Sequence, residues 1–236
     1  MNKTIYSFAI AILMALGSCS DDEKVIDVAP VDRGTVTDNQ GNVYDWVRIG
    51  DLDWTTSNAR NGAPMTEGQY FDNFSWEDIF DSRQKVDVEE NYMPVYGNLM
   101  PYDEAKESVP EGWRLPTDED WQKLERALGM KDADRRGWRG SAGVGTLMMS
   151  PESGCGLGIQ LGGSMLRQRS YGVFTFSLDY EGEYGWYWTD TKDPDTRIQD
   201  TDVYYFRKFT PLQGGVCRES TRKENYLSVR WVRDAR

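Results

Sequence analysis

The chain contains no histidine, and its 236 residues include only three cysteines and nine prolines. Without an imidazole it cannot form a Ser-His-Asp triad, a Cys-His pair or a His-ligated metal site. Lys and Arg total 27 against 39 Asp and Glu, which gives a formal net charge of −12. This excess of negative charge argues against nucleic acid as a partner.

Aromatic residues, in contrast, are abundant: they make up 13% of the chain and include nine Trp and thirteen Tyr. The length is sufficient for one domain with a substantial core. Although the mean hydropathy is low, this aromatic content argues against a disordered chain. The composition therefore predicts a single folded domain.

Residues 1–18 have the pattern of a secretory signal peptide. Lys3 precedes an apolar run from Ile5 to Leu16, which is too short to span a bilayer comfortably. Residues 16–19, Leu-Gly-Ser-Cys, resemble a bacterial lipobox, in which cleavage precedes the cysteine and its thiol receives a diacylglyceryl group with acyl chains such as palmitate. An ordinary signal peptide that happens to contain a cysteine is the alternative. We expect Cys19 to be a lipid attachment site that holds the protein on the outer membrane without a spanning segment.

The composition of residues 19–34 predicts an acidic tether. The cluster Ser-Asp-Asp-Glu-Lys at 20–24 resembles the surface-export signal of Bacteroidetes lipoproteins, and it is also typical of a solvated linker. The segment lacks hydrophobic periodicity and contains Pro30. We therefore expect a surface-exposed globular domain over residues 35–236.

Two cysteines, Cys155 and Cys217, fall in this expected domain. In an oxidising envelope a disulfide between them would close a loop of about 60 residues and contribute up to ~4 kcal/mol. Neither has the spacing of a zinc knuckle or of a CxxC redox motif. The sequence does not decide whether Cys155 and Cys217 form a disulfide or stay as two separate thiols.

The pattern of short apolar and aromatic runs separated by turn residues predicts an α+β fold with an antiparallel sheet rather than a βαβ array. Residues 42–49 and 52–55 form a predicted hairpin around Gly50-Asp51, and residues 102–108 form a short predicted helix before Pro110. Further strands are expected at 173–176, 184–189, 203–206 and 226–232.

One strong helix is predicted directly after residue 117. Thr117 and Asp120 match the capping box [ST]-x-x-[DE], and Asp118 and Glu119 complete an acidic first turn that suits the helix dipole. Gly129 is placed to end the helix. The apolar face comprises Trp121, Leu124 and Leu128. The three consecutive acids are thus explained by helix initiation rather than by catalysis.

Several segments together resemble the Fibrobacter succinogenes major paralogous (FISUMP) domain family. They are Gly50-x3-Trp54-x3-Asn58, the run Trp113-Arg114-Leu115-Pro116-Thr117, then Trp121, Gly162-Gly163, Gly185-Trp186-Tyr187-Trp188 and Ser228-Val229-Arg230-x-Val232-Arg233-Asp234. The resemblance implies envelope lipoproteins with a C-type lectin-like fold: short antiparallel strands, one main helix and long irregular loops. It also implies Trp113 and Trp121 as core anchors.

The chain departs from that family pattern at two positions. Many members carry one Cys just before Pro-x-Gly-Trp and another in a final Val-Arg-Cys-Val, where this sequence has Val109 and Trp231. The resemblance therefore implies that Cys155 and Cys217 form a different bridge or stay as thiols. The family is also distantly similar to formylglycine-generating enzyme, but the reactive cysteine pair of that activity is missing, and Cys217 has only Arg218 beside it to lower its pKa.

Three other chemistries have candidates in the sequence. Four carboxylates, Asp193, Asp195, Asp200 and Asp202, could bind calcium, but they do not match EF-hand spacing and are more typical of a solvated acidic loop, so no cofactor is expected.

Glycoside hydrolysis needs two facing carboxylates, and nothing in the sequence selects a pair. Trp186 and Trp188 could stack on a sugar, but their alternation with Tyr187 in a strand favours core packing, and the basic island at 135–139 is most often a solvated loop.

We therefore predict a surface-anchored lipoprotein that binds a glycan or an envelope protein without catalysis. The alternatives are an envelope enzyme that uses carboxylate catalysis on glycans or proteins, and a structural or adhesin subunit. An exposed aromatic groove would favour a glycan, and two facing carboxyls with raised pKa in a deep pocket would favour hydrolysis. A large flat apolar patch would favour a protein partner.

Overall fold

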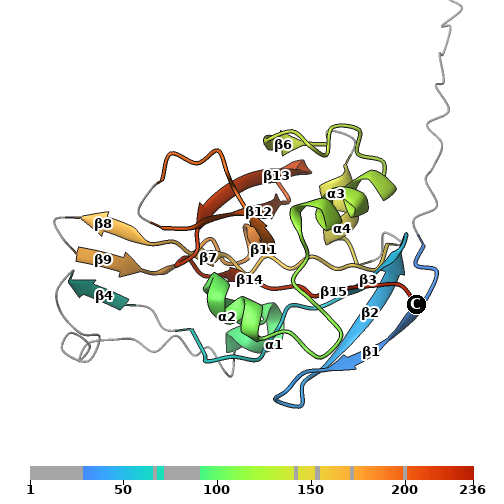
Figure 1. Cartoon of the computed structure of the whole chain (residues 1–236), viewed down its shortest axis with the longest axis horizontal. Coiled ribbons are helices and arrows are strands. Elements are labelled where there is room, and N and C mark those ends of the chain that lie inside the picture. The colour runs from blue at the N-terminus through green and yellow to red at the C-terminus, as the bar shows by residue number, and fades with distance from the viewer. Residues whose placement is uncertain are drawn as a thin grey trace, which may run out of the picture.

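The computed structural model describes residues 29–65, 68–71, 91–140, 143–151, 155–170, 173–198 and 201–236. The predicted signal peptide, Cys19 and most of the tether lie outside these ranges. Within them, none of the helices combines the length and the apolar character needed to cross a membrane. The first described strand and the C-terminus lie at the same end of the molecule (Figure 1).

A six-stranded sheet forms the centre, in the order β5-β14-β11-β12-β13-β6. All neighbouring pairs are antiparallel except β11 and β14, which are parallel. Its long strands alternate as expected, because Tyr187 enters one buried cluster whereas Trp186 and Trp188 enter another. The strands are β5 (Leu99–Met100), β6 (Gly137–Arg139), β11 (Gly185–Lys192), β12 (Val203–Thr210), β13 (Gln213–Arg222) and β14 (Leu227–Ser228).

A four-stranded sheet in the order β1-β2-β3-β15 lies beside it (Figure 1). The predicted hairpin is confirmed, since β2 and β3 pair antiparallel on either side of Gly50, whose φ of 63° suits glycine. The strand β1 begins at Arg33, two residues before the expected start of the domain. The strands are β1 (Arg33–Thr37), β2 (Val43–Ile49), β3 (Leu52–Thr55) and β15 (Val232–Asp234).

The prediction of one continuous strand over residues 226–232 is wrong. The chain leaves the central sheet after β14 and joins the second sheet only at β15. Between them the Arg230 guanidinium is buried and donates to the carbonyl oxygens of Thr55 (2.6 Å) and Leu157 (2.9 Å) and to Asn58 Oδ1 (2.6 Å). These bonds hold the crossing between the two sheets, which a continuous strand could not make.

Two small sheets and four helices complete the described ranges, so the structure is mostly β and compatible with the predicted α+β class. β7 (Ser164–Met165) pairs with β10 (Leu178–Asp179). β4 (Gly68–Phe71), β9 (Val173–Phe176) and β8 (Gln168–Ser170) form a sheet at the other end of the molecule from the C-terminus (Figure 1). The helices are α1 (Met93–Tyr96), α2 (Tyr102–Glu107), α3 (Asp118–Ala127) and α4 (Val144–Met149).

The longest helix, α3, begins with the predicted capping box. Thr117 Oγ1 accepts from the Asp120 backbone N–H at 3.1 Å, and Asp120 Oδ2 accepts from the Thr117 N–H at 2.8 Å. Trp121 is fully buried, with its ring centroid 4.9 Å from that of Trp54. Helices α3 and α4 both contribute to the cluster that covers one face of the central sheet.

Buried ion pairs also fix α3 on the sheet. The carboxylate of Asp118 lies 2.7 Å from Arg207 Nη1 and 2.7 Å from Arg218 Nη2, and Glu125 lies 2.7 Å from Arg207 Nε and 2.8 Å from Arg139 Nη1. Burial alone would raise the pKa of Asp118, but the hydrogen bonds and charges of Arg218 and Arg207 outweigh it and hold the pKa below its ordinary value. The expected first-turn acid is therefore a link between α3 and two strands.

We predict that Asp118→Asn destabilises the protein by about 3–5 kcal/mol, because the variant keeps the side-chain volume but leaves Arg207 and Arg218 buried with one charge partner fewer. Urea unfolding followed by tryptophan fluorescence measures this loss. The matched control is Glu119→Gln on the same helix. The Glu119 side chain is 76% exposed, and its ion pair with Lys123 is long, at 3.9 Å. This control substitution should change stability by less than about 0.5 kcal/mol. Equal effects of the two substitutions would contradict the assignment.

The same variant should lose part of the acid sensitivity of the fold. The pKa of Asp118 is lower in the folded chain than its ordinary value of 3.8. The contribution of its ionised carboxylate to the free energy of unfolding is therefore fully present above pH 3.8. It is then lost as the pH falls through the folded pKa. The difference in unfolding free energy between wild type and Asp118→Asn should be constant near neutral pH and shrink below about pH 4.

Candidate binding site

The segment Trp113–Thr117 is fastened to the last strand. Arg114 and Val232 exchange backbone hydrogen bonds at 2.9 Å in both directions, and Arg114 Nη2 donates to Asp234 Oδ1 at 3.0 Å. The Arg233 guanidinium lies 4.7 Å from the centroid of the Trp113 ring. Two parts of the family signature that are far apart in sequence thus meet and hold each other.

The other residues of the segment Trp113–Thr117 also hold it against the rest of the domain, and we call this set of contacts the frame. Leu115 is buried, and the carbonyl oxygen of Pro116 accepts from the Asp190 N–H at 2.8 Å. Asp120 forms an ion pair with Arg114 in addition to the capping box. Because these groups are used in packing, ion pairs and internal hydrogen bonds, a ligand site is better sought outside this segment.

Cys155 and Cys217 do not form the possible disulfide, since each is a separate buried thiol. Cys155 lies in the cluster beneath α3 together with Val216, and its Sγ donates to the Leu147 carbonyl oxygen at 3.3 Å. Cys217 follows Val216 on β13 and therefore faces the opposite side of the sheet. Burial raises the pKa of the Cys217 thiol although Lys208 opposes the shift.

We predict that Cys155 and Cys217 react with a chromogenic thiol reagent only after denaturation. A Cys19→Ala chain should show no rapidly reacting thiol when native and two per chain in guanidinium, because both Sγ atoms are buried. Its midpoint of thermal unfolding should be the same with and without dithiothreitol. One thiol or none in guanidinium, or a midpoint lowered by reductant, would instead indicate a disulfide.

The acidic loop considered for calcium has its own counter-ions. Ser220 Oγ donates to Asp193 Oδ2 at 2.6 Å and Arg136 also binds that oxygen. Burial would raise the pKa of Asp193, but these partners hold it at about 2. Lys192 lies 2.7 Å from Asp202, and Asp200 is outside the described residues. In the ranges that the structure covers, no three Cys, Asp or Glu side chains are grouped as a metal site would require.

Carboxylate chemistry finds no pair in the described part of the chain. Burial raises the pKa of Glu104, whose Oε1 accepts from the Ala63 N–H at 2.8 Å. The five other described carboxyls with a shifted pKa are all lowered: Asp38, Asp53, Asp118, Asp120 and Asp193. Two facing carboxyls with raised pKa, as a general acid and its partner would need, are therefore not brought together among these residues.

One open hollow of about 440 Å³ lies against β1 and β2. Its floor includes Trp46, whose Nε1 donates to the Thr35 carbonyl oxygen at 3.2 Å. The hollow offers this single aromatic side chain and the polar ends of Arg33 and Asp45. It is a weaker candidate than the aromatic cluster on the central sheet.

That cluster is built on the sheet face opposite α3. Trp186 on β11, Lys208 on β12, Cys217 on β13 and Trp138 on β6 are successive cross-strand neighbours. The Nζ of Lys208 lies 5.5 Å from the ring centroid of Trp138 and 5.6 Å from those of Tyr184 and Trp186. These distances are those of cation–π contacts, so three rings surround one ammonium group.

Tyr180 adds an exposed ring at the edge of this cluster. Its side chain is 54% exposed, and its centroid lies 5.5 Å from Tyr184 and 5.8 Å from Trp186. Tyr180 has a φ of 64° and is the one non-glycine residue with positive φ in the described ranges. A bulky residue in that conformation costs stability and often marks a functional position.

A glycine of the family signature makes room for this turn. Gly163 has a φ of 73°, and a Cβ there would lie 2.4 Å from the Asp179 carbonyl oxygen and 2.9 Å from the Glu181 nitrogen. Gly163 also donates its N–H to the Tyr184 carbonyl oxygen at 2.8 Å. The Gly162-Gly163 pair, which is part of the resemblance, therefore positions the backbone that presents Tyr180.

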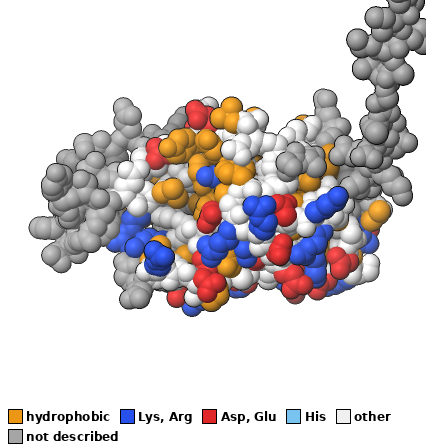
Figure 2. All heavy atoms as spheres, turned by 90° about the horizontal axis from the view of Figure 1, so that it is seen from above, with side chains coloured by type: hydrophobic (Ala, Val, Ile, Leu, Met, Phe, Trp, Pro, Cys, Tyr) orange, Lys and Arg blue, Asp and Glu red, His pale blue; other side chains and the backbone are white. Residues whose placement is uncertain are grey.

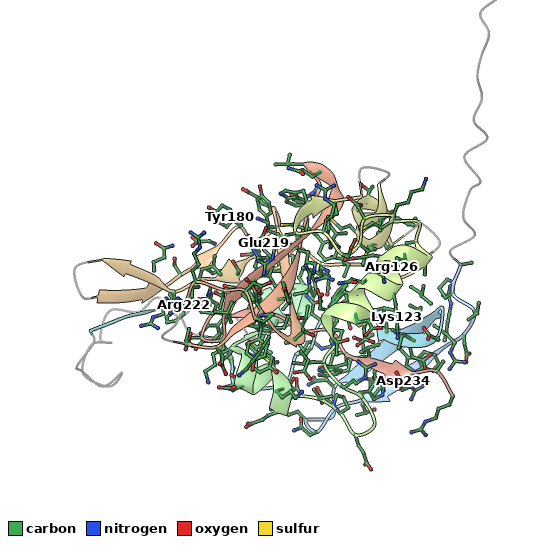
Figure 3. The ribbon with its side chains drawn as sticks, turned by 45° about the horizontal axis from the view of Figure 1, so that its top comes forward. Lys123, Arg126, Tyr180, Glu219, Arg222 and Asp234 are labelled. Carbon is green, nitrogen blue, oxygen red and sulfur yellow. The ribbon has the colours of Figure 1, made fainter. Side chains whose placement is uncertain are left out.

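β6 and β13 lie at the top of the molecule in Figure 1, and Figure 2 looks down on that side. It shows hydrophobic side chains gathered in one area, whereas Lys, Arg, Asp and Glu cover the neighbouring surface. In Figure 3, Tyr180 and Glu219 both lie on this upper side, and Lys123 and Arg126 lie further along, on α3. Of the cluster, Tyr180 is thus exposed on this side, whereas Trp186 is buried.

The sequence assigned Trp186 to the core, which is confirmed because its side chain is buried in a hydrophobic cluster. The basic island that contains Trp138 was expected to be a solvated loop, but Trp138 lies in strand β6. Sequence reasoning missed Tyr180, Tyr184 and Lys208 as members of one cluster. The available signal was the spacing of three rings, Tyr180-x3-Tyr184-x-Trp186, around a Gly-containing turn. Lys208 joins them only through the strand register.

The chain belongs to the Fibrobacter succinogenes major domain family, whose model matches residues 47–233. That span includes the segment Trp113–Thr117, its partners described above except Asp234, and every residue of the aromatic cluster. No curated protein and no solved structure is significantly similar to the chain.

Proposed function

We propose that the protein is a surface-anchored bacterial lipoprotein whose domain, with a C-type lectin-like fold, binds a glycan without catalysis at the cell envelope. The observation that carries this proposal is the aromatic cluster on the central sheet, in which the exposed ring of Tyr180 and the partly exposed rings of Trp138 and Tyr184 are grouped with the buried Trp186. Aromatic faces pack against the C–H faces of sugar rings, and a few polar groups nearby set orientation.

The arrangement of the two sheets suits a tethered receptor. Strands β1 and β15 share the four-stranded sheet, whereas the aromatic cluster stands on the six-stranded sheet. A tether that enters the domain just before β1 would therefore leave the cluster free to face away from the membrane. One main helix packed on a largely antiparallel sheet, with long connections, is also what a C-type lectin-like domain would present.

The alternatives have less support in the described residues. A carboxylate enzyme would need the facing acid pair that these residues do not supply. An adhesin with a flat apolar interface would need clustered exposed aliphatic side chains. The exposed large hydrophobic residues besides Tyr180 are instead scattered over different elements: Val31, Val43, Val95 and Leu212.

We predict that Tyr180→Asn lowers glycan binding by about tenfold while leaving the free energy of unfolding within about 1 kcal/mol of wild type. Asparagine adopts positive φ more readily than tyrosine, which offsets the loss of ring contacts with Tyr184 and Trp186. A glycan array identifies the ligand for wild type, and titration with that ligand gives the affinity of the variant.

Tyr180→Phe, which keeps the ring, and Val43→Ala, on the other sheet, are the controls and should bind as wild type does. The array is run with calcium and with a chelator, which also tests the acidic loop. Silence of the wild type in both conditions would move the proposal to the structural or adhesin alternative. Retained binding by Tyr180→Asn and Trp138→Ala would place the site elsewhere.

We also predict that Cys19→Ala releases the protein from the membrane fraction of its native host. The wild type should carry acyl chains at Cys19 and be accessible to protease on intact cells, because the thiol is the attachment point and the acidic tether follows it. Mass spectrometry of the mature N-terminus and cell fractionation measure this. A variant that stays membrane-bound would contradict lipid anchoring through Cys19.

A further inference from the structure

We propose that the glycan bound at this cluster is acidic, and that the ammonium group of Lys208 holds its anionic group while the exposed ring of Tyr180 packs against the sugar face. This inference rests on the proposed glycan-binding function and adds the chemical class of the ligand. It is carried by the charge of Lys208, for which the described residues supply no counter-ion.

Most described lysines have a carboxylate within ion-pair distance, and Lys208 does not. The ammonium group of Lys208 makes cation–π contacts, and no ion pair or hydrogen bond joins it to any described residue. The lysines with a carboxylate partner at 3.9 Å or less are Lys106, Lys123, Lys192 and Lys223. In a chain with 39 acidic residues, a half-buried lysine without such a partner is a vacancy for an external anion.

The rings strengthen the case for an anion. They remove part of the water around Nζ and replace it with aromatic faces, which attract the cation but do not neutralise it. In these partly dry surroundings a carboxylate or sulfate beside Nζ gains more than it would in water. A cationic ligand is disfavoured at the same place, because Lys208 already occupies the space between Trp138, Tyr184 and Trp186.

The nearest acidic side chain on this face of β13 does not take the role of counter-ion. Glu219, labelled in Figure 3, follows Cys217 by two residues on the same face. Its carboxylate lies 3.7 Å from Arg136 Nη1. Both Lys208 and Glu219 influence the pKa of the Cys217 thiol between them, although burial is the larger effect. Glu219 therefore pairs with Arg136, and the Lys208 ammonium lies among the three rings.

The experiment compares three oligosaccharides of one backbone: a galacturonate oligomer, its neutral carboxyl-reduced counterpart, and that counterpart after sulfation, which makes it anionic. Wild type should bind both acidic forms about tenfold more tightly than the neutral one. The neutral form cannot accept the charge-assisted hydrogen bond that the Lys208 ammonium donates to a carboxylate or sulfate. Lys208→Met keeps the apolar stem and should lose this preference while still binding the neutral form. Lys208→Arg should retain the preference.

The outcomes separate the two proposals. Binding of the neutral form that falls with Tyr180→Asn, together with no preference for acid in wild type, overturns the role of Lys208 and leaves glycan binding in place. A preference that survives in Lys208→Met, with unfolding midpoints equal to wild type, also overturns it. Absence of binding to all three forms and to the array overturns both proposals.

Discussion

Two buried carboxylates on α3 hold three arginines that come from three neighbouring strands, and the architecture depends on this arrangement. Asp118 and Glu125 bind Arg139, Arg207 and Arg218, on β6, β12 and β13 respectively. Removing one partner from such a network is costly because the others stay desolvated. A one-residue slip of any of these strands would turn its arginine to the other face. The network is therefore compatible with one register of the sheet.

In that register, adjacent residues of one strand face two different environments on opposite sides of the sheet. Arg207 faces the buried carboxylates, whereas the next residue, Lys208, faces the aromatic rings. On the neighbouring strand Arg218 faces α3 and Cys217 faces Lys208. The helix thus covers one side of the sheet with charge and apolar packing, whereas the opposite side carries a second buried cluster and the rings around Lys208. The family signature contributes mainly to the frame that keeps both sides in place.

Local signals made much of the frame predictable, and long-range contacts explain what was not. Thr117 and Asp120 are three residues apart, so the cap of α3 could be read directly from the sequence. Asp118 binds arginines 89 and 100 residues away, and no local pattern announces them. The same limit applies to the ligand site, because Lys208 meets its rings only across paired strands. Tyr180 escaped prediction since tyrosine rarely adopts a positive φ.

The pairing of β15 with β3 has a consequence for the order of folding. Arg233 on β15 binds Asp53 on β3 across 180 residues of sequence, so the four-stranded sheet stays incomplete until that late segment arrives. Contacts of such high sequence separation form slowly, and the domain should close in one late step. For a chain that is exported as proposed, this delay would keep it threadable during translocation, and the finished fold would form on the far side of the membrane.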